Sequence, residues 1–173
     1  MAADPKVILF GGVGSATSSM AKCFPGFLVY SNDEAEGKLD EILREIDSHP
    51  GQKYIVAGHS SGAVHAERVG RKVRNPDQIK LVLLDGYGDE KVQDRVKDSS
   101  CWYAMRGNSG SLNSESMKKI CKHPKKYEDD HCNTAWCLHF SLVNSNAPAD
   151  LRQGTFRAQG YANCKANLRW VNE

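Results

Sequence analysis

The chain has 173 residues, of which 40% are hydrophobic and 25% are charged, and its formal net charge is +2. This composition is typical of a folded globular protein and excludes a disordered or fibrous chain. The basic residues are scattered among acidic ones, which argues against a nucleic-acid-binding protein. A chain of this length predicts one domain that spans residues 1–173.

Membrane and export signals are also missing from the sequence. No apolar run approaches the roughly 20 residues that a membrane-spanning helix needs. The first residues do not show the charged and apolar regions of a signal peptide. We therefore expect no transmembrane segment.

The N-terminal part of the chain alternates strand-like and helix-like patterns. Lys6–Phe10 is apolar and runs into Gly11-Gly12-Val13-Gly14, which predicts a buried strand followed by a tight turn. Residues 15–22 favour the start of a helix, and residues 27–30 a second short strand. Residues 34–48 predict an amphipathic surface helix, whose apolar positions are Leu39, Ile42, Leu43 and Ile46.

The rest of the chain continues the alternation. A strand is predicted at Tyr54–Ala57, a helix from Ala63 to about Arg74, and a strand at Lys80–Leu84. The remaining predicted elements are a strand at Cys101–Met105, a helix at Ser114–Cys121, a weak last strand at Tyr127–Cys132 and a helix that opens at His139–Asn144. Strands that alternate with helices predict an α/β fold, a three-layer sandwich with a mostly parallel sheet.

The segment Gly58-His59-Ser60-Ser61-Gly62 matches the pattern G-x-S-x-G. A predicted strand enters the motif and a predicted helix leaves it, which is the setting of a nucleophile elbow. In such a turn the backbone is strained, and side chains on the flanking glycines would collide with neighbouring backbone. The serine hydroxyl is thereby exposed, so Ser60 is the candidate nucleophile. The alternative is a plain glycine and serine turn.

On this motif, its setting and the order of elements, the sequence resembles the α/β-hydrolase superfamily. It is most similar to the small esterases and lipases that lack a large lid, and the resemblance extends over nearly the whole chain. It implies a minimal α/β-hydrolase fold and a triad in the order serine, acid, histidine. It also implies an enzyme that cleaves a carboxylic ester of a small or lipid-like molecule, with thioesters and amides left open.

Asp85 is the candidate acid. It directly follows the strand after the elbow helix, so its carboxylate should lie at the same edge of the sheet as Ser60. In many members of the superfamily the acid follows one strand later, where this chain has no carboxylate before Glu115. Asp89 and Glu115 are therefore weaker candidates. The alternative for Asp85 is a turn residue ahead of Gly86.

His139 is the candidate base among six histidines. Position argues against four of them: His49 and His123, which precede prolines in polar loops, and His59 and His65, which lie within the motif and on its helix. His131 and His139 are left. His139 is favoured because it follows the last predicted strand, where the loop of the superfamily carries its base.

The general serine mechanism then assigns the remaining roles. The backbone amides of Ser61 and Val13 are the candidate oxyanion hole, because a tetrahedral intermediate needs hydrogen-bond donors for its charged oxygen. Four glycines would support the two loops: Gly11, Gly12, Gly58 and Gly62. The mechanism needs neither a cofactor nor a metal.

The cysteines form an even set: Cys23, Cys101, Cys121, Cys132, Cys137 and Cys164. An even number favours disulfides, and a zinc site is disfavoured because no two cysteine pairs have matching short gaps. Cys101 with Cys121 and Cys132 with Cys137 would be local pairs, although sequence alone leaves the pairing open. The disulfides and a mature-like N-terminus favour a secreted or periplasmic protein, with a cytoplasmic location left open.

Two alternatives belong to other functional classes. Gly12-x-Gly14 after the first strand and Asp33 after the second match part of a dinucleotide-binding fingerprint, but Thr17 stands in place of its third glycine. The other alternative is a binding protein that keeps the hydrolase fold without catalysis. The oligomeric state is left open.

Overall fold

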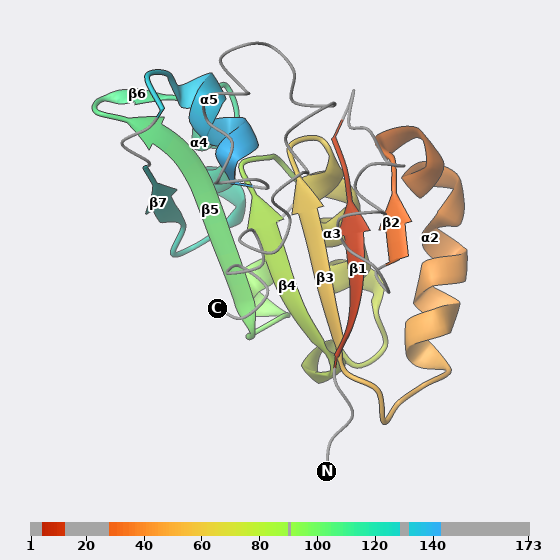
Figure 1. Ribbon diagram of the computed structural model, residues 1–173. Helices are drawn as coiled ribbons and strands as arrows, with labels where there is room; N and C mark the ends of the chain where they lie inside the picture. The colour runs from red at the N-terminus through yellow and green to blue at the C-terminus, as the bar shows by residue number, and fades with distance from the viewer. Residues whose placement is uncertain (1–4, 13–27, 90, 129–131, 143–173) are drawn as a thin grey trace.

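The computed structural model describes residues 5–12, 28–89, 91–128 and 132–142. These residues form one sheet with the strand order β2-β1-β3-β4-β5-β6, and β7 also pairs with β5 (Figure 1). The strands are β1 (Lys6–Phe10), β2 (Leu28–Tyr30), β3 (Tyr54–His59), β4 (Ile79–Leu84), β5 (Ser99–Arg106), β6 (Ser109–Gly110) and β7 (Lys125–Tyr127). Only the β5–β6 pair is antiparallel among the described pairs.

Helices cover both faces of this sheet. They are α2 (Asn32–Asp47), α3 (Gly62–Lys72), α4 (Ser114–Ile120) and α5 (Ala135–Ser141), with short 3₁₀ helices at Pro76–Gln78 and Val92–Asp94. One apolar core joins alternate strand residues such as Ile8, Val56 and Leu83 to α2, α3 and α4. A second core joins the intervening residues to α5, whose Leu138 is fully buried. The predicted three-layer α/β architecture with a mostly parallel sheet is therefore confirmed.

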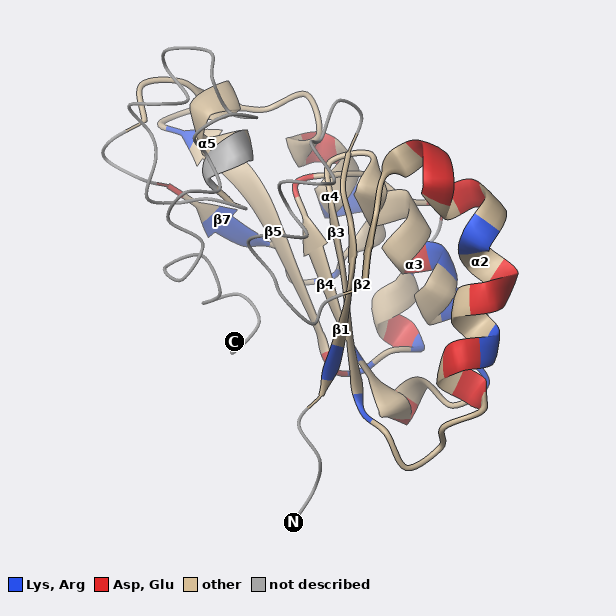
Figure 2. Ribbon diagram, turned by 45° about the vertical axis from the view of Figure 1, so that its right-hand side comes forward, with Lys and Arg blue, Asp and Glu red and all other residues tan. Residues whose placement is uncertain are grey.

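Helix α2 illustrates how the sequence forms its local structure. Its N-cap residue Ser31 accepts a hydrogen bond from the amide of Glu34, and the Ser31 hydroxyl donates to the carboxylate of the same residue. Ile42 and Ile46 are buried against the sheet. Figure 2 shows that acidic residues are frequent along α2. Most of them are exposed, so this surface is solvated, as the amphipathic pattern predicts: Asp33, Glu34, Glu36, Asp40 and Glu41.

Two of the predicted boundaries are wrong. The last parallel strand is Lys125–Tyr127 and not Tyr127–Cys132. Its first two residues are exposed lysines, because β7 pairs with β5 at the edge of the sheet, where charged side chains are favoured. The last described helix begins at Ala135, before the predicted start at His139. The predicted helix start at residues 15–22 lies outside the described residues.

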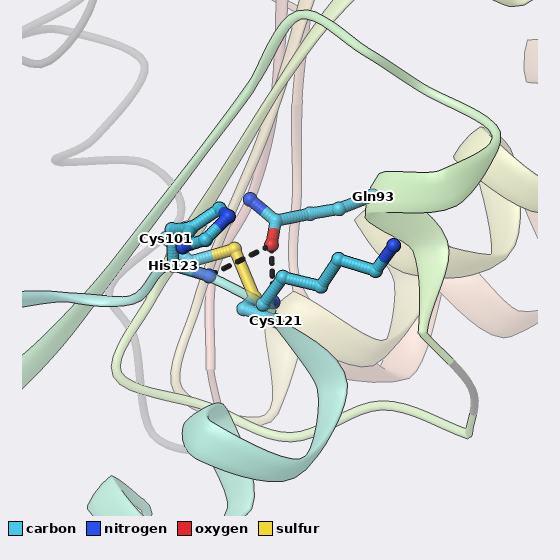
Figure 3. Close-up of a disulfide and its surroundings, with 5 residues drawn as sticks. Gln93, Cys101, Cys121 and His123 are labelled. Carbon is cyan, nitrogen blue, oxygen red and sulfur yellow. Dashed lines mark hydrogen bonds between the residues drawn. A yellow bond between two sulfur atoms is a disulfide. The ribbon is translucent and has the colours of Figure 1, made fainter.

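The predicted local cysteine pairs are both present. Cys101 is bonded to Cys121, and Cys132 is bonded to Cys137, while Cys23 and Cys164 lie outside the described residues. The first disulfide is buried between β5 and the end of α4 (Figure 3). Next to it, the side-chain oxygen of Gln93 accepts hydrogen bonds from the amides of Lys122 and His123. The disulfide and Gln93 together hold the segment that leads into β7.

None of the described helices has the length and apolar character needed to span a bilayer. The prediction that a single domain spans residues 1–173 stays a prediction.

We expect the Cys101–Cys121 disulfide to contribute more to stability than Cys132–Cys137. The two pairs are separated by 20 and 5 residues, and closing a longer loop restricts the unfolded chain more. The double variant Cys101→Ala/Cys121→Ala should lower the free energy of unfolding by about 3 kcal/mol, and Cys132→Ala/Cys137→Ala by about 2 kcal/mol. Urea unfolding of both variants measures this difference. The reverse order would contradict the expectation.

Candidate active site

Ser60 lies in a sharp turn between β3 and α3. Its φ of 57° is in the left-handed region, which residues other than glycine rarely adopt. The Ser60 amide donates a hydrogen bond to the carbonyl of Leu84, at 2.9 Å. A Cβ on Gly58 would lie 2.3 Å from the carbonyl oxygen of Gly62, and one on Gly62 would lie 2.3 Å from that of Phe10. The turn therefore has the strained backbone expected from the motif, and glycines flank it because the space for side chains is missing.

The order of the strands also indicates a ligand-binding position next to Ser60. The strand order β2-β1-β3-β4-β5 reverses direction between β1 and β3, and open parallel sheets bind ligands at such a switch point, beyond the carboxyl ends of the strands. Ser60 follows β3 and Gly11-Gly12 follow β1. A Cβ on Gly12 would lie 2.8 Å from the Cβ of Ser60. The loop after β1 thus packs directly on the candidate nucleophile.

Asp85 follows β4, the strand next to β3, and it is fully buried. Its φ of 44° is also in the left-handed region. One carboxylate oxygen accepts a hydrogen bond from the amide of Ala104 at 3.0 Å, and the other accepts one from the hydroxyl of Ser111 at 2.6 Å. The second oxygen also contacts Nδ1 of His139. These donors offset the loss of hydration that a buried carboxylate suffers.

His139 belongs to helix α5 and contacts Asp85, although the two residues are 54 positions apart in the chain. Figure 1 shows α5 at the carboxyl ends of β4 and β5. The imidazole is buried, and the ring of Trp136 lies edge-on to it with the ring centroids 5.2 Å apart. His139 lies within the helix, and not in a loop as the superfamily resemblance implied. The structure nevertheless brings positions 85 and 139 together, as the sequence predicts.

His59 makes a second contact with the same residue. Its Nε2 lies 2.6 Å from the carbonyl oxygen of His139, and the two imidazole centroids are 4.5 Å apart. The pKa of His59 is lowered from 6.5 to about 3, first because burial disfavours the charged ring and second because His139 is close. His59 is therefore a neutral imidazole, and its Nε2–H donates to the carbonyl.

The weaker candidates lie elsewhere. Asp89 is exposed and pairs with Arg68 and Arg71, and Glu115 pairs with Lys118 on the surface of α4. Neither carboxylate contacts Asp85 or His139 in any described interaction. His131 lies outside the described residues.

Only some of the residues predicted for the glycine loop and the oxyanion hole lie in the described part of the chain. Gly11 donates its amide to the carbonyl of Tyr30 at 2.9 Å, and Ser61 is the N-cap of α3. Val13 lies outside the described residues. Asp33, which the dinucleotide alternative requires, is exposed in the first turn of α2. Gly14 and Thr17 of that alternative also lie outside the described residues.

Sequence analysis missed two neighbours of this site. Ser111 follows a polar stretch without a recognisable pattern, so nothing in the sequence marks it as a donor to Asp85. The place of His59 in the motif argues against it as the base, and no sequence pattern indicates its contact with His139. The one available signal was physical, since a buried aspartate must find donors somewhere in the fold.

A cavity of about 410 Å³ lies between β2 and α2, away from these residues. It is lined by Ile8, Leu28, Tyr30, Glu41, Ile42, Arg44, Glu45 and Ser48. None of the residues around Ser60 contributes to it, so we do not assign it to the candidate active site.

Comparison with known proteins adds a description of the fold. No protein-family model and no curated protein sequence matches the chain. The fold is similar to that of a candidate hydrolase of the α/β superfamily from Xanthomonas campestris pv. campestris, with a TM-score of 0.47 and 15% identity over 87% of this chain and 99% of that chain. It is also similar to a cutinase-like protein from Cryptococcus sp., with a TM-score of 0.39 and 13% identity over 96% of this chain and 95% of the other.

An acetyl xylan esterase is a further structure with a similar fold, with a TM-score of 0.33 and 13% identity over 98% of each chain. At these identities and TM-scores the similarity assigns no activity. The function is therefore inferred from the residues of this chain alone.

We expect Ser111→Ala to destabilise the protein by about 2 kcal/mol, because it removes a donor from a buried charged acceptor. Ser109→Ala is the matched control, since Ser109 is exposed in the neighbouring strand β6 and its loss should stay within about 0.5 kcal/mol. Urea unfolding of the two variants tests this. Equal effects would mean that the Ser111 hydroxyl contributes nothing to holding Asp85.

The lowered pKa of His59 predicts an acid-dependent stability. Between pH 6.5 and about 3 the unfolded chain binds a proton at His59 that the folded protein does not. The neutral His59 therefore stabilises the folded protein fully above pH 6.5. This part of the free energy of unfolding is lost as the pH falls, with a slope of at most about 1.4 kcal/mol per pH unit. The free energy of unfolding of the wild type should exceed that of His59→Gln at pH 7, and urea unfolding should show this difference shrinking at pH 5 and again at pH 4. A constant difference between the two proteins would contradict the expectation.

Proposed function

We propose that this protein is a serine hydrolase of the α/β-hydrolase superfamily that cleaves a carboxylic ester through an acyl-enzyme. Ser60 is the proposed nucleophile, His139 the base and Asp85 the acid that orients the base. The observation that carries this proposal is the buried contact between Asp85 and Nδ1 of His139, beside the left-handed turn at Ser60. A small or lipid-like ester is the proposed substrate.

The proposed reaction uses the two nitrogens of His139 differently. Because the carboxylate of Asp85 accepts a hydrogen bond from Nδ1, that nitrogen carries the proton in the neutral ring, and Nε2 is the nitrogen assigned to proton transfer. Nε2 takes the proton of the Ser60 hydroxyl as the oxygen attacks the ester carbonyl carbon. The imidazolium that forms is stabilised by the adjacent carboxylate.

Collapse of the tetrahedral intermediate breaks the bond to the alcohol. The leaving oxygen takes the proton from His139, and the acyl group stays on Ser60. A water molecule then repeats the sequence, with His139 removing its proton, and the acid is released. The amides of Ser61 and Val13 are proposed to bind the oxyanion, and an oxyanion-hole donor of this kind typically contributes about 10²-fold or more to turnover.

The cysteines support a proposal for the compartment. The two disulfides of the described residues favour an oxidising environment, since cysteine thiols are kept reduced in the cytosol of most organisms. We therefore propose a secreted or periplasmic protein.

Labelling with a fluorophosphonate tests the proposed function. The reagent should modify Ser60, identified by peptide mapping, and Ser60→Ala should abolish labelling. His139→Ala and Asp85→Asn should slow labelling and ester hydrolysis by at least about 10³-fold. Ser48→Ala, an exposed serine at the end of α2, is the matched control and should react like the wild type.

Two outcomes would overturn the proposal. A folded protein that is inert toward the fluorophosphonate and toward activated esters would be a binding protein on a hydrolase-like fold. Tight binding of a nicotinamide cofactor, measured by calorimetry, would favour the dinucleotide alternative.

A further inference from the structure

One buried imidazole near the site has no role in the proposed reaction. His59 directly precedes Ser60 and is 3% exposed. Its Nε2 faces the carbonyl of His139 at 2.6 Å. The two histidines are 80 positions apart in the chain, so this hydrogen bond connects the nucleophile turn to helix α5.

The carbonyl that receives this bond lies near the end of a short helix. Helix α5 has seven residues, and His139 belongs to its last turn. Carbonyls near the end of a helix are commonly satisfied by donors from outside the helix. His59 supplies such a donor from the buried side, where an unpaired carbonyl would be costly.

A disulfide, a hydrogen bond and core packing also hold helix α5, but at residues other than His139. The Cys132–Cys137 disulfide and the hydroxyl of Thr134, which accepts from the amide of Cys137 at 3.1 Å, hold the first turn. Leu138 is buried in the core on this face of the sheet. None of these contacts reaches the backbone of His139 itself.

His139 is thus held both at its ring and at its backbone. Asp85 binds Nδ1 of its ring, and His59 binds its backbone carbonyl. A ring held only at Nδ1 could still pivot about that contact, whereas fixing the backbone as well restricts where Nε2 lies relative to Ser60. Misplacing a reacting group by about 1 Å can lower the rate about 10²-fold.

We propose that His59 is a positioning residue for the base, which ties the backbone of His139 to the turn that carries Ser60. The inference rests on the proposed function and adds a residue that the Ser60, His139 and Asp85 assignment does not contain. The Nε2 of His59 is directed at the His139 carbonyl, so this nitrogen holds His139 and does not face Ser60 as a base.

Two amide substitutions separate positioning from packing. In His59→Gln the side-chain NH₂ can occupy nearly the position of the imidazole Nε2, whereas in His59→Asn the amide is one carbon shorter and does not reach the carbonyl. Both variants are polar and smaller than histidine, so they disturb the core in similar ways. His49→Gln is the control for the same replacement at a surface position, since the His49 side chain is 51% exposed.

The measurements are kcat and KM for p-nitrophenyl acetate, expressed per active site titrated with the fluorophosphonate, together with the thermal midpoint of unfolding. We expect His59→Asn to lower kcat per active site by about tenfold or more, with KM changed less than about twofold. His59→Gln should restore kcat to within about threefold of the wild type. His49→Gln should not differ from the wild type.

Each other result overturns the inference. If His59→Asn keeps the wild-type kcat per titrated site and only its thermal midpoint falls, His59 merely fills the core. If His59→Gln loses as much kcat as His59→Asn, or if His59→Asn does not fold while His59→Gln folds and has lost its activity, the hydrogen bond to His139 is not what matters. Failure of the proposed function is distinguishable, because the wild type itself would then not be labelled at Ser60.

Discussion

Asp85 places a carboxylate in a fully buried position, and the arrangement of the site follows from the need to surround it with donors. Those donors come from β5 through Ala104, from the segment after β6 through Ser111, and from α5 through His139. Taking an unpaired charge out of water would destabilise the fold by several kcal/mol. The same contacts that make burial tolerable therefore also draw three distant segments of chain to one end of the sheet.

The turn at Ser60 depends on a different constraint, which is the lack of space. Glycines at positions 12, 58 and 62 leave room for backbone and for the Ser60 side chain, and a Cβ at any of them would lie within 3 Å of a neighbouring atom. The strain at a left-handed serine persists because both of its backbone groups are held: its amide donates to Leu84 of β4, and its carbonyl accepts from the amide of Ala63 in α3. Parallel pairing of β1, β3 and β4 therefore positions the candidate nucleophile as well as building the core.

The two histidines at positions 59 and 139 have separate environments and separate chemistry. His59 faces a carbonyl and stays neutral, while the ring of His139 faces a carboxylate that can stabilise a positive charge. Two imidazoles with ring centroids 4.5 Å apart could otherwise compete for one proton. Their different partners are the basis on which proton transfer is proposed for His139 and a positioning role for His59.

The sequence by itself determined the α/β class, the positions of five parallel strands and the strained turn at Ser60, since hydrophobic periodicity and glycine spacing are local properties. It indicated that the two disulfides could form as local pairs, but it left the pairing open. It also indicated Asp85 and His139 as partners through the order of elements. Only the tertiary structure decided that Ser111 and His59 join them, that β7 is an edge strand that begins with two exposed lysines, and that the helix carrying His139 begins as early as Ala135. These features depend on contacts between segments far apart in the chain, and no local pattern records which distant donor will reach a buried acceptor.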